Sequence, residues 1–508
     1  MYQSFYPEYA SRKQEDHVSL GCIDNFINTD LWQNPTKLSE LSAQPFQPYF
    51  ENEEVRNGFH YPLVLTMDEH TIPGYFFHHH LAHAAASYYL SPFDEAAIIT
   101  HDGFANAESY HSGMFYYGSQ NKIYPITPHY LTLGGLYERV GIALGLGSVG
   151  SPGRLMGLAS YGQPRFFSSK FVGNGHDHRA KFELPTSQAW LEHCLTAAKQ
   201  MGYDLSVYGK REHATAPINV DIAASTQKLF EQTRLLATEV LGEICRSAGR
   251  PTKALCLSGG TALNVPSNTQ IYNESPFSQV YIEPACDDGG LSIGAALCLY
   301  HNVFDHPKTK SDQPYASPYV GANYTTENIE AAISKFEDKI EVHRDIDFIE
   351  DAAQSLANNE VIGWYEGCSE AGPRALGHRS IMADPRDAQN WPRVNEIKSR
   401  ELWRPFAPAV LESEVSNWFF GAPDRAPYML FNSVVRSNQI PAVTHVDNTA
   451  RIQTVDPTCG NYFKVISRFF ELTKVPVVMN TSFNGPGEPI VEKPEEAIAF
   501  LLSSKRII

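Results

Sequence analysis

The sequence predicts a multidomain α/β protein, and three observations support this fold class. Its 508 residues exceed the usual size of a single hydrophobic core, so two or three domains are expected. Apolar residues make up 43% and charged residues 19% of the chain, as in an ordinary soluble globular protein. Residues 253–296 twice combine a short apolar run, a glycine turn and a helical pattern, which is typical of layered α/β sheets.

Charge and composition exclude several classes of partner. A formal charge of −17 argues against duplex nucleic acid, whose phosphates require a basic face. Met1–His17 lacks the apolar core of a signal peptide, and nowhere do eighteen consecutive apolar residues occur. We therefore expect a cytoplasmic protein with no membrane partner. Its eight cysteines form no CxxC pair, which favours reduced thiols without structural zinc.

The first readable element is a histidine-bearing helix. Residues 1–75 show no clear periodicity and predict only mixed structure. The segment 78–89 is rich in helix formers, and in a helix His79 and His83 share one face, where both imidazoles can reach one metal ion. Because most HxxxH spacings are incidental, a third ligand is needed before this pair predicts a metal site.

That ligand follows a short strand. Ala96–Thr100 is a buried apolar run, and Asp102 lies just beyond its carboxyl end, where open α/β sheets bind ligands. A carboxylate with two imidazoles suits iron, manganese or zinc. Met114–Tyr117 and Lys122–Ile126 then predict a β-hairpin.

The rest of the first half alternates glycine turns with helices. Residues 185–250 look mainly helical, with Ile222–Ile244 the clearest amphipathic run. Lys253–Leu257 predicts a strand that leads into Ser258–Asn264, whose backbone amides suit a phosphate. A second strand at Gln279–Glu283 leads into another double glycine. One such unit usually marks a plain turn, but two in succession suggest the nucleotide-binding architecture of actin and sugar kinases.

A polar segment, His306–Pro318, predicts a linker to the second half. The polar loop Asn480–Ile490 suits ligand binding and turn formation about equally. The other elements expected in this half are helices at 326–336 and 348–358, a strand at 361–364, a helix within 454–476 and a strand at 475–479.

The stretch 364–408 is unusual for so acidic a chain. Between Arg374 and Arg404 it holds seven Lys or Arg residues against four acids. A guanidinium grips phosphate or carboxylate with two parallel charge-assisted bonds. Surface ion pairs would explain any single arginine equally well, but these cations are set among glycine, proline and apolar residues. The stretch therefore predicts a site for a small anion.

Together these motifs resemble the O-carbamoyltransferases of the nodulation and antibiotic-biosynthesis type. The resemblance covers the chain from about residue 75 to 500, in the family's order. The matching segments are HHHLAHAAASYYLSPF with ITHDG, SPGRLMGLASYG, SGGTALN, DDGGLSIGAAL, EAGPRALGHRSI to RPFAPAVL, HVDNTARIQTV and NTSFNGPGEPIV.

The resemblance implies two domains and a two-step reaction. Residues 1–318 would form an actin-like carbamoyl-transfer domain, its first 75 residues divergent or incomplete. Residues 319–508 would form a YrdC-like α/β domain that joins carbamoyl phosphate and ATP into a carbamoyl-adenylate. The carbamoyl group then passes to a hydroxyl of a small-molecule natural product. ATP implies Mg²⁺, and the first domain implies one transition metal, for which iron is preferred.

The resemblance also implies three sets of site residues. The cations expected to hold carbamoyl phosphate and ATP are Arg374, Arg379, Lys398, Arg400 and Arg404. The expected nucleotide-binding residues are Gly259, Gly260, Asn264, Asn480, Ser482 and Asn484. The expected metal ligands are His79, His83, Asp102 and Asp288.

Departures from the family pattern support an alternative hypothesis. Residues 1–75 lack the family's Gly...His-Asp-x-Ser motif, Cys368 stands where an arginine is usual, and the chain stops at Ile508, before the usual closing strand. Arg154 replaces a lysine, a milder change. The alternative is a catalytically impaired relative that acts as a binding or regulatory partner. Carbamoyl modification of tRNA is disfavoured by the acidic charge, and a sugar kinase would not need the stretch 364–408.

Overall fold

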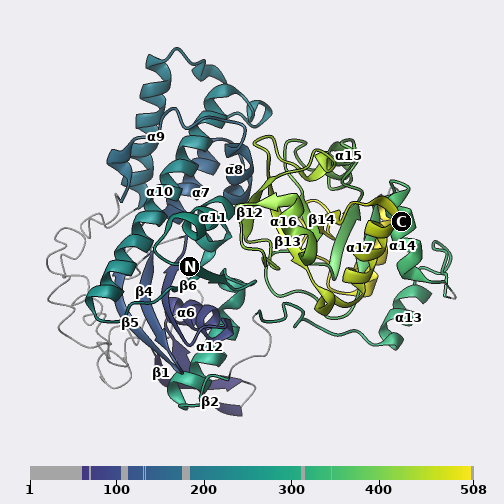
Figure 1. The fold of residues 1–508 in the computed structure, drawn as a ribbon, viewed down its shortest axis with the longest axis horizontal. Coiled ribbons are helices and arrows are strands. Elements are labelled where there is room, and N and C mark those ends of the chain that lie inside the picture. The colour runs from purple at the N-terminus through teal and green to yellow at the C-terminus, as the bar shows by residue number, and fades with distance from the viewer. Residues whose placement is uncertain are drawn as a thin grey trace.

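The computed structural model describes residues 60–67, 70–103, 112–129, 131, 133–173, 183–309, 315–344 and 346–504. These residues form two lobes, 60–309 and 315–504, each built on a sheet that carries helices (Figure 1). Both sheets contain parallel and antiparallel pairs, so the predicted α/β class is confirmed. Of the segment 1–75, residues 1–59, 68 and 69 lie outside the described residues.

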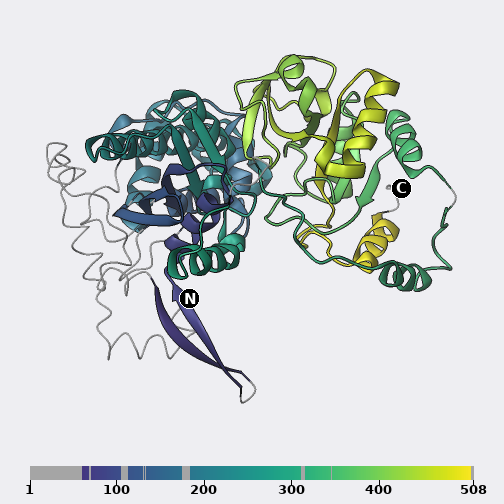
Figure 2. The same ribbon diagram turned by 60° about the horizontal axis from the view of Figure 1, so that its bottom comes forward.

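The described chain begins with a two-stranded antiparallel ribbon. It pairs β1 (His60–Met67) with β2 (His70–Phe77) in register from end to end. Figure 2 shows this ribbon projecting from the body of the first lobe.

The first lobe is organised around a five-stranded sheet with the order β5-β4-β3-β6-β7. Its central strand β3 pairs antiparallel with β4 and parallel with β6, which places the carboxyl ends of β3, β6 and β7 at one edge. The strands are β3 (Glu95–His101), β4 (Gly113–Ser119), β5 (Lys122–His129), β6 (Ala254–Ser258) and β7 (Gln279–Ile282). All of these strands were predicted to within a few residues.

Helix α6 (His79–Leu90) packs against the sheet, and α12 (Leu291–Cys298) packs on α6. The second half of α10 (Pro217–Ser247) also shares the apolar core of the sheet, through Ala237, Leu241 and Ile244. The contact of α6 with α12 is so close that a Cβ on Gly294 would lie 1.9 Å from the carbonyl oxygen of Ala82, so only glycine fits there. The helices are α6 (His79–Leu90), α7 (Leu133–Ala143), α8 (Ser151–Ala159), α9 (Glu183–Gln200), α10 (Pro217–Ser247), α11 (Val265–Glu274) and α12 (Leu291–Cys298), which continues as a π-helical turn (Leu299–Val303).

Helices α7 to α10 have an apolar core of their own. Trp190 is fully buried there and packs edge-on against the ring of Phe171. The long helix α10 confirms the amphipathic run predicted at Ile222–Ile244. It starts at Pro217, whose fixed φ and missing N–H suit a first helical position.

The second lobe carries a seven-stranded sheet with the order β11-β12-β13-β10-β14-β9-β8, in which only β10 and β13 pair in parallel. Its strands are β8 (Ile362–Tyr365), β9 (Arg379–Ala383), β10 (Ala407–Leu411), β11 (Phe419–Phe420), β12 (Phe431–Val435), β13 (Thr449–Val455) and β14 (Val477–Ser482). Its helices are α13 (Thr326–Ser334), α14 (Phe348–Ala357), α15 (Asn390–Ile397), α16 (Val415–Trp418), α17 (Gly460–Thr473) and α18 (Pro494–Ser504).

The predicted linker 306–318 joins the lobes, and its residues 310–314 lie outside the described residues. Before this gap, Lys308 Nζ donates to the carbonyl oxygen of Tyr88 in the first lobe (2.9 Å). After it, the hydroxyl of Tyr315 donates to the carbonyl oxygen of Arg425 in the second (3.1 Å). None of the described helices has both the length and the apolar character needed to cross a membrane.

Direct contacts also hold the lobes together. The hydroxyl of Tyr161 donates to the carbonyl oxygen of Trp403 (2.9 Å), and Nδ2 of Asn268 donates to that of Leu430 (3.0 Å). A Cβ on Gly372 would lie 2.2 Å from the carbonyl oxygen of Pro284, so the two backbones touch there. The lobes therefore share a packed interface along which a joint site can form.

Candidate functional site

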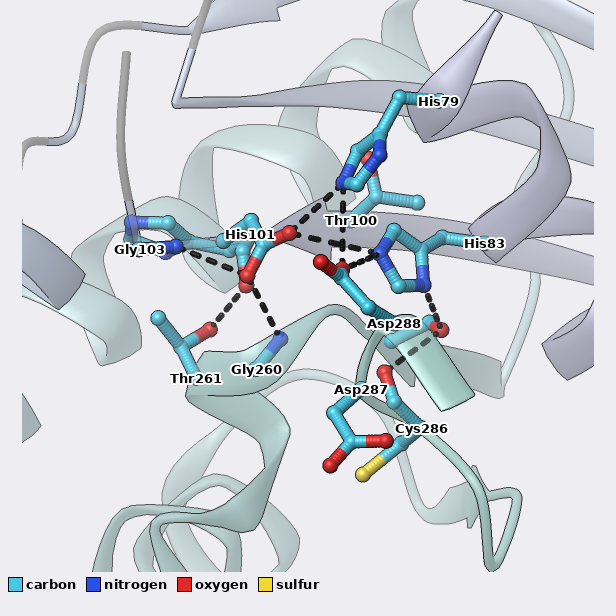
Figure 3. Close-up of polar contacts among 12 residues, drawn as sticks. His79, His83, Thr100, His101, Gly103, Gly260, Thr261, Cys286, Asp287 and Asp288 are labelled. Atoms are coloured by element: carbon cyan, nitrogen blue, oxygen red, sulfur yellow. Dashed lines mark hydrogen bonds and ion pairs between the residues drawn. The ribbon is translucent and has the colours of Figure 1, made fainter. Parts of the chain in front are cut away.

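The first candidate site is a cluster of two histidines and two aspartates at the carboxyl edge of the five-stranded sheet (Figure 3). His79 and His83 lie one turn apart on α6, and Asp102 directly follows β3. Asp288 opens a short 3-10 turn ahead of α12. One ligand atom from each side chain lies within 4.8 Å of the others, so the structure brings all four predicted ligands together.

The geometry of the cluster suits a cation. Nε2 of His79 lies 2.7 Å from Oδ2 of Asp102 and 3.5 Å from Oδ1 of Asp288. Nε2 of His83 is buried and makes no hydrogen bond within the described residues, and the same two carboxylate oxygens lie 3.5 and 3.4 Å away. Such an orphaned nitrogen facing two carboxylates fits a transition metal with mixed N and O ligands.

The electrostatics of the cluster agree with its geometry. Burial alone would raise the pKa of Asp102, but the imidazoles of His79 and His83 hold that pKa well below its usual range. Burial alone would lower the pKa of His83, but the carboxylates of Asp102 and Asp288 outweigh it and raise the pKa to about 9. A metal bound here would take the place of a proton on His83, so metal binding would release protons.

The glycine pair after β6 shapes this cluster. Oδ1 of Asp102 accepts hydrogen bonds from the backbone N–H of Gly103 (2.8 Å) and of Gly260 (3.1 Å), which leaves Oδ2 to face the imidazoles. A Cβ on Gly260 would lie 2.9 Å from that Oδ1. Gly259 has φ +88°, and a Cβ there would lie 2.3 Å from the carbonyl oxygen of His101. The structure thus places both predicted nucleotide-binding glycines beside the cluster of two histidines and two aspartates.

Asn264, predicted to bind the same nucleotide, has its side chain committed within the protein. Its Oδ1 accepts from the backbone N–H of Ser267 (3.1 Å) and so caps the start of α11. Its amide also exchanges two hydrogen bonds with Gln227. The nucleotide-binding role of these three residues stays a prediction.

The second candidate site is a cavity of about 310 Å³ between the lobes. Four arginines line it: Arg374, Arg400, Arg404 and Arg451. The first lobe contributes the start of α11 and one side of α8, through Gly153, Met156, Gly157, Ser160, Val265 and Pro266. Asn480 and Ser482 from β14 also line the cavity. Five of the eleven predicted anion- and nucleotide-binding residues therefore meet here.

The arginines of this cavity repel one another. Burial and then the neighbouring Arg404 lower the pKa of Arg400 to about 9. Burial, followed by the charges of the other three arginines, lowers the pKa of Arg451 well below its usual range. Nε of Arg374 and Nε of Arg451 are buried without a hydrogen-bond partner within the described residues. Buried cations left unpaired in this way mark a site for an anion.

Arg451 was not among the predicted site residues, although its segment carried part of the resemblance. It lies in β13 between Ala450 and Ile452, both buried. No local signal identifies it, because successive strand residues face opposite sides of the sheet, and an arginine between two apolar residues is the ordinary pattern of a half-exposed strand.

Arg379 and Lys398 do not line the cavity. The fully buried guanidinium of Arg379 donates to the carbonyl oxygens of Glu366 (2.7 Å) and Gly367 (3.0 Å), and it lies 3.7 Å from the ring centroid of Tyr365. It thus holds the loop that precedes Arg374. That Arg379 contacts the anion stays a prediction.

Lys398 supports the other wall of the cavity. Its Nζ donates to Oδ1 of Asn484 (2.7 Å) and to Oγ of Ser482 (3.3 Å), so it anchors the end of β14. Burial, with the charges of Arg400 and Arg404, lowers its pKa well below the usual value. Asn484 is likewise outside the cavity wall and acts as the partner of Lys398. Cys368, where the family has an arginine, does not line the cavity either.

Comparisons with known proteins show the family to which the chain belongs. The sequence model described as the carbamoyltransferase N-terminus matches residues 36–297, and that of the carbamoyltransferase C-terminus matches residues 353–506. An uncharacterized protein of Synechocystis sp. is 35% identical over 463 residues, which cover 84% of this chain and 73% of that protein. Nodulation protein NolO of Bradyrhizobium diazoefficiens is 33% identical over 437 residues, 84% of this chain and 76% of the relative.

Nodulation protein NolNO of Sinorhizobium fredii is 34% identical over 440 residues, which cover 84% of this chain and 62% of the relative. All of the segments that carried the resemblance in the sequence fall within the two matched regions. The chain therefore belongs to the carbamoyltransferase family, and the prediction of a carbamoyltransferase enzyme is confirmed at that level.

Proposed function

We propose that this protein is an ATP-dependent O-carbamoyltransferase that activates carbamoyl phosphate as a carbamoyl-adenylate. We further propose that it transfers the carbamoyl group to a hydroxyl of a small-molecule natural product in the cytoplasm. The first lobe would be the actin-like carbamoyl-transfer domain. The second lobe would be the YrdC-like activation domain. The strand order β5-β4-β3-β6-β7 supports the first of these assignments, because the glycine turn after β6 faces Asp102 after β3 at one sheet edge.

The observation that carries the proposal is the cavity lined by four arginines. Carbamoyl phosphate and ATP are both polyanions. A cavity with four cations, two of which have a buried Nε without a hydrogen-bond partner in the described part of the chain, suits their phosphates. Its volume of about 310 Å³ is at the lower end of the range for small-molecule sites. An anion bound between the arginines attracts each of them, and this attraction offsets their mutual repulsion.

The activation step needs these charges. Carbamoyl phosphate, ATP and water give carbamoyl-adenylate, phosphate and pyrophosphate. Two phosphate-bearing leaving groups develop charge during this reaction, and Arg374, Arg400 and Arg404, which line the cavity, would neutralise it. Arg400 is held for this by its contact with Phe406, whose ring centroid lies 4.3 Å from the guanidinium carbon. Mg²⁺ would accompany ATP.

The transfer step joins carbamoyl-adenylate and the acceptor hydroxyl into the carbamoylated product and AMP. A transition metal held by His79, His83, Asp102 and Asp288, with iron preferred over manganese and zinc, would supply Lewis acidity toward a carbonyl or a hydroxyl. Asp288 is the exposed member, with 69% of its side-chain surface accessible, so the cluster opens toward solvent on its side. His83 is its buried member, with none of its side-chain surface accessible.

The test is mass-spectrometric detection of AMP and pyrophosphate after the protein is incubated with ATP, Mg²⁺ and carbamoyl phosphate. A matched reaction without carbamoyl phosphate is the control. Nucleotide turnover only when carbamoyl phosphate is present supports the proposal. No turnover by the folded, metal-loaded protein would contradict the proposal. It would favour the alternative, a catalytically impaired relative that acts as a binding or regulatory partner. The arginines retained in the cavity make that alternative the less favoured one.

A further inference from the structure

A serine and a buried glutamate lie behind the imidazole of His83. Ser258 ends β6, and Glu283 follows the last residue of β7. Because Leu257 and Ile282 pair in register on these parallel strands, the next residue of each strand is a neighbour of the other. Oγ of Ser258 lies 3.1 Å from Oε1 of Glu283 and 3.4 Å from Nδ1 of His83. The three polar groups thus form a chain that starts at the metal cluster.

Glu283 has no evident role in the packing of the fold. It is 1% exposed and pairs with no lysine or arginine in the part of the chain that the structure describes. Its Oε2 is buried without a hydrogen-bond partner within those residues. Burying a carboxyl group in this way is costly, so a functional reason for its position is expected.

Ser258 connects this carboxyl group to a metal ligand. Its hydroxyl is also 3.4 Å from the carbonyl oxygen of Cys286, but that oxygen already accepts a shorter bond from the backbone N–H of Gly259 (2.7 Å). The Cys286 carbonyl therefore does not depend on Ser258. The hydroxyl is free to accept from His83 and donate to Glu283.

The contacts from Glu283 through Ser258 to His83 matter because each imidazole nitrogen can coordinate a metal or carry a proton. Nε2 of His83 faces the carboxylates of Asp102 and Asp288, whereas Nδ1 faces Ser258. A metal-bound imidazole usually donates its other N–H to an acceptor, which fixes the ring orientation and the tautomer and strengthens the ligand.

We propose that Ser258 and Glu283 are positioning residues of the metal centre. Nδ1–H of His83 donates to Ser258, whose hydroxyl donates to Glu283, and Nε2 is thereby held as the metal-binding nitrogen. This inference rests on the proposed metal centre. Neither Ser258 nor Glu283 belonged to the predicted metal ligands or to the predicted nucleotide-binding residues.

The test titrates Co²⁺ into the metal-free full chain and follows both the dissociation constant and the visible d–d absorption. The variants are Ser258→Ala, Glu283→Gln and Glu283→Ala. The matched control is Ser87→Ala, which removes another fully buried hydroxyl, one that donates to the carbonyl oxygen of Leu257 and does not reach the cluster. Metal-free melting temperatures are recorded for every variant.

We expect Ser258→Ala and Glu283→Ala to raise the Co²⁺ dissociation constant about 10-fold or more and to shift the absorption bands. Glu283→Gln keeps an acceptor for the serine but loses the charge, so it should fall between wild type and Glu283→Ala. Ser87→Ala should bind Co²⁺ like wild type. A merely structural role would lower melting temperatures without this order or the spectral shift.

Two outcomes would overturn the inference. If Ser258→Ala and Glu283→Gln both gave wild-type dissociation constants and spectra, Ser258 and Glu283 would not position His83. The proposed metal centre itself would remain supported. Failure of the wild-type protein to bind Co²⁺ at all would remove the metal centre as well. If Ser258→Ala does not fold, Glu283→Gln, which is nearly isosteric, decides alone.

Discussion

Arg374 and Arg451 line the same interdomain cavity, and each has a buried Nε that meets no hydrogen-bond acceptor within the described residues. Arg374 comes from the loop before β9 and Arg451 from the middle of β13, so the seven-stranded sheet brings them together across the chain. Burial, and then the charges of Arg374, Arg400 and Arg404, lowers the pKa of Arg451 well below its usual range. The arginines therefore repel one another in the free protein, and a bound anion would offset this repulsion.

Replacing Arg451 by methionine should separate ligand binding from stability. Removal of one repelled, buried cation should leave the melting temperature of the free protein unchanged or higher. Loss of its charge-assisted bonds, worth about 1.5–3 kcal/mol, should weaken carbamoyl phosphate binding about 10- to 100-fold. Calorimetric titration and thermal unfolding measure the two effects. Unaltered affinity in Arg451→Met would remove this residue from the anion site.

Arg374→Ala should abolish carbamoyl-phosphate-dependent turnover of ATP while the fold survives. Its guanidinium lines the cavity, and its buried Nε has no hydrogen-bond partner among the described residues whose loss would disturb the surrounding loop. The matched control is Arg386→Ala, since Arg386 lies in the same basic stretch but pairs with Asp384 away from the cavity. Pyrophosphate release measures both variants. Turnover that persists in Arg374→Ala, or vanishes equally in Arg386→Ala, would contradict the assignment.

His79→Ala should lower the amount of metal bound by the purified protein. Its Nε2 lies within reach of both carboxylates of the cluster, so its loss removes one of four ligands. His213→Ala is the control, because His213 is exposed in a short 3-10 helix outside the cluster. Elemental analysis of both proteins after dialysis gives the result. Full metal occupancy in His79→Ala would exclude it as a ligand.

Glu283 should make the stability of the metal-free protein depend on pH. Burial raises its pKa to about 7, so the folded state holds the proton more tightly than the unfolded state. The stabilising contribution is complete below the unfolded pKa, near 4.5, and is lost as pH rises through 7. Linkage gives a loss of roughly 3 kcal/mol between these limits.

The comparison that isolates this effect is wild type against Glu283→Gln. Glutamine does not titrate, so the variant should gain stability relative to wild type as pH rises from 5 to 8. Chemical denaturation at several pH values, with metal removed, measures the difference. Parallel stability curves for the two proteins would show that Glu283 keeps an ordinary pKa.

Local patterns in the sequence predicted the first lobe well because its signals are local. The helix that carries His79 and His83 and the strand that ends before Asp102 both follow from short-range periodicity. Asp288 was different: its position beside the histidines depends on the parallel pairing of β6 and β7, which no local pattern encodes. Only the resemblance to a family indicated it.

The anion site shows the limit of arguing from charge density. Of the five cations predicted from the basic stretch, Arg379 and Lys398 lie outside the cavity wall and hold loops through backbone and amide acceptors, and their contact with an anion stays a prediction. Arg451, far along the chain, lines the cavity instead because β13 pairs in parallel with β10 in the sheet. Density of charge locates a region, whereas sheet topology decides which side chains meet.

The most direct measurement of the central claim uses carbamoyl phosphate labelled with ¹³C at the carbonyl. The protein is incubated with it, ATP and Mg²⁺ without an acceptor, and the nucleotides are analysed by mass spectrometry. We predict a labelled carbamoyl-adenylate in the wild-type reaction and its loss in Arg374→Ala. Unlabelled products only, from a folded protein that binds both substrates, would contradict activation in the arginine-lined cavity.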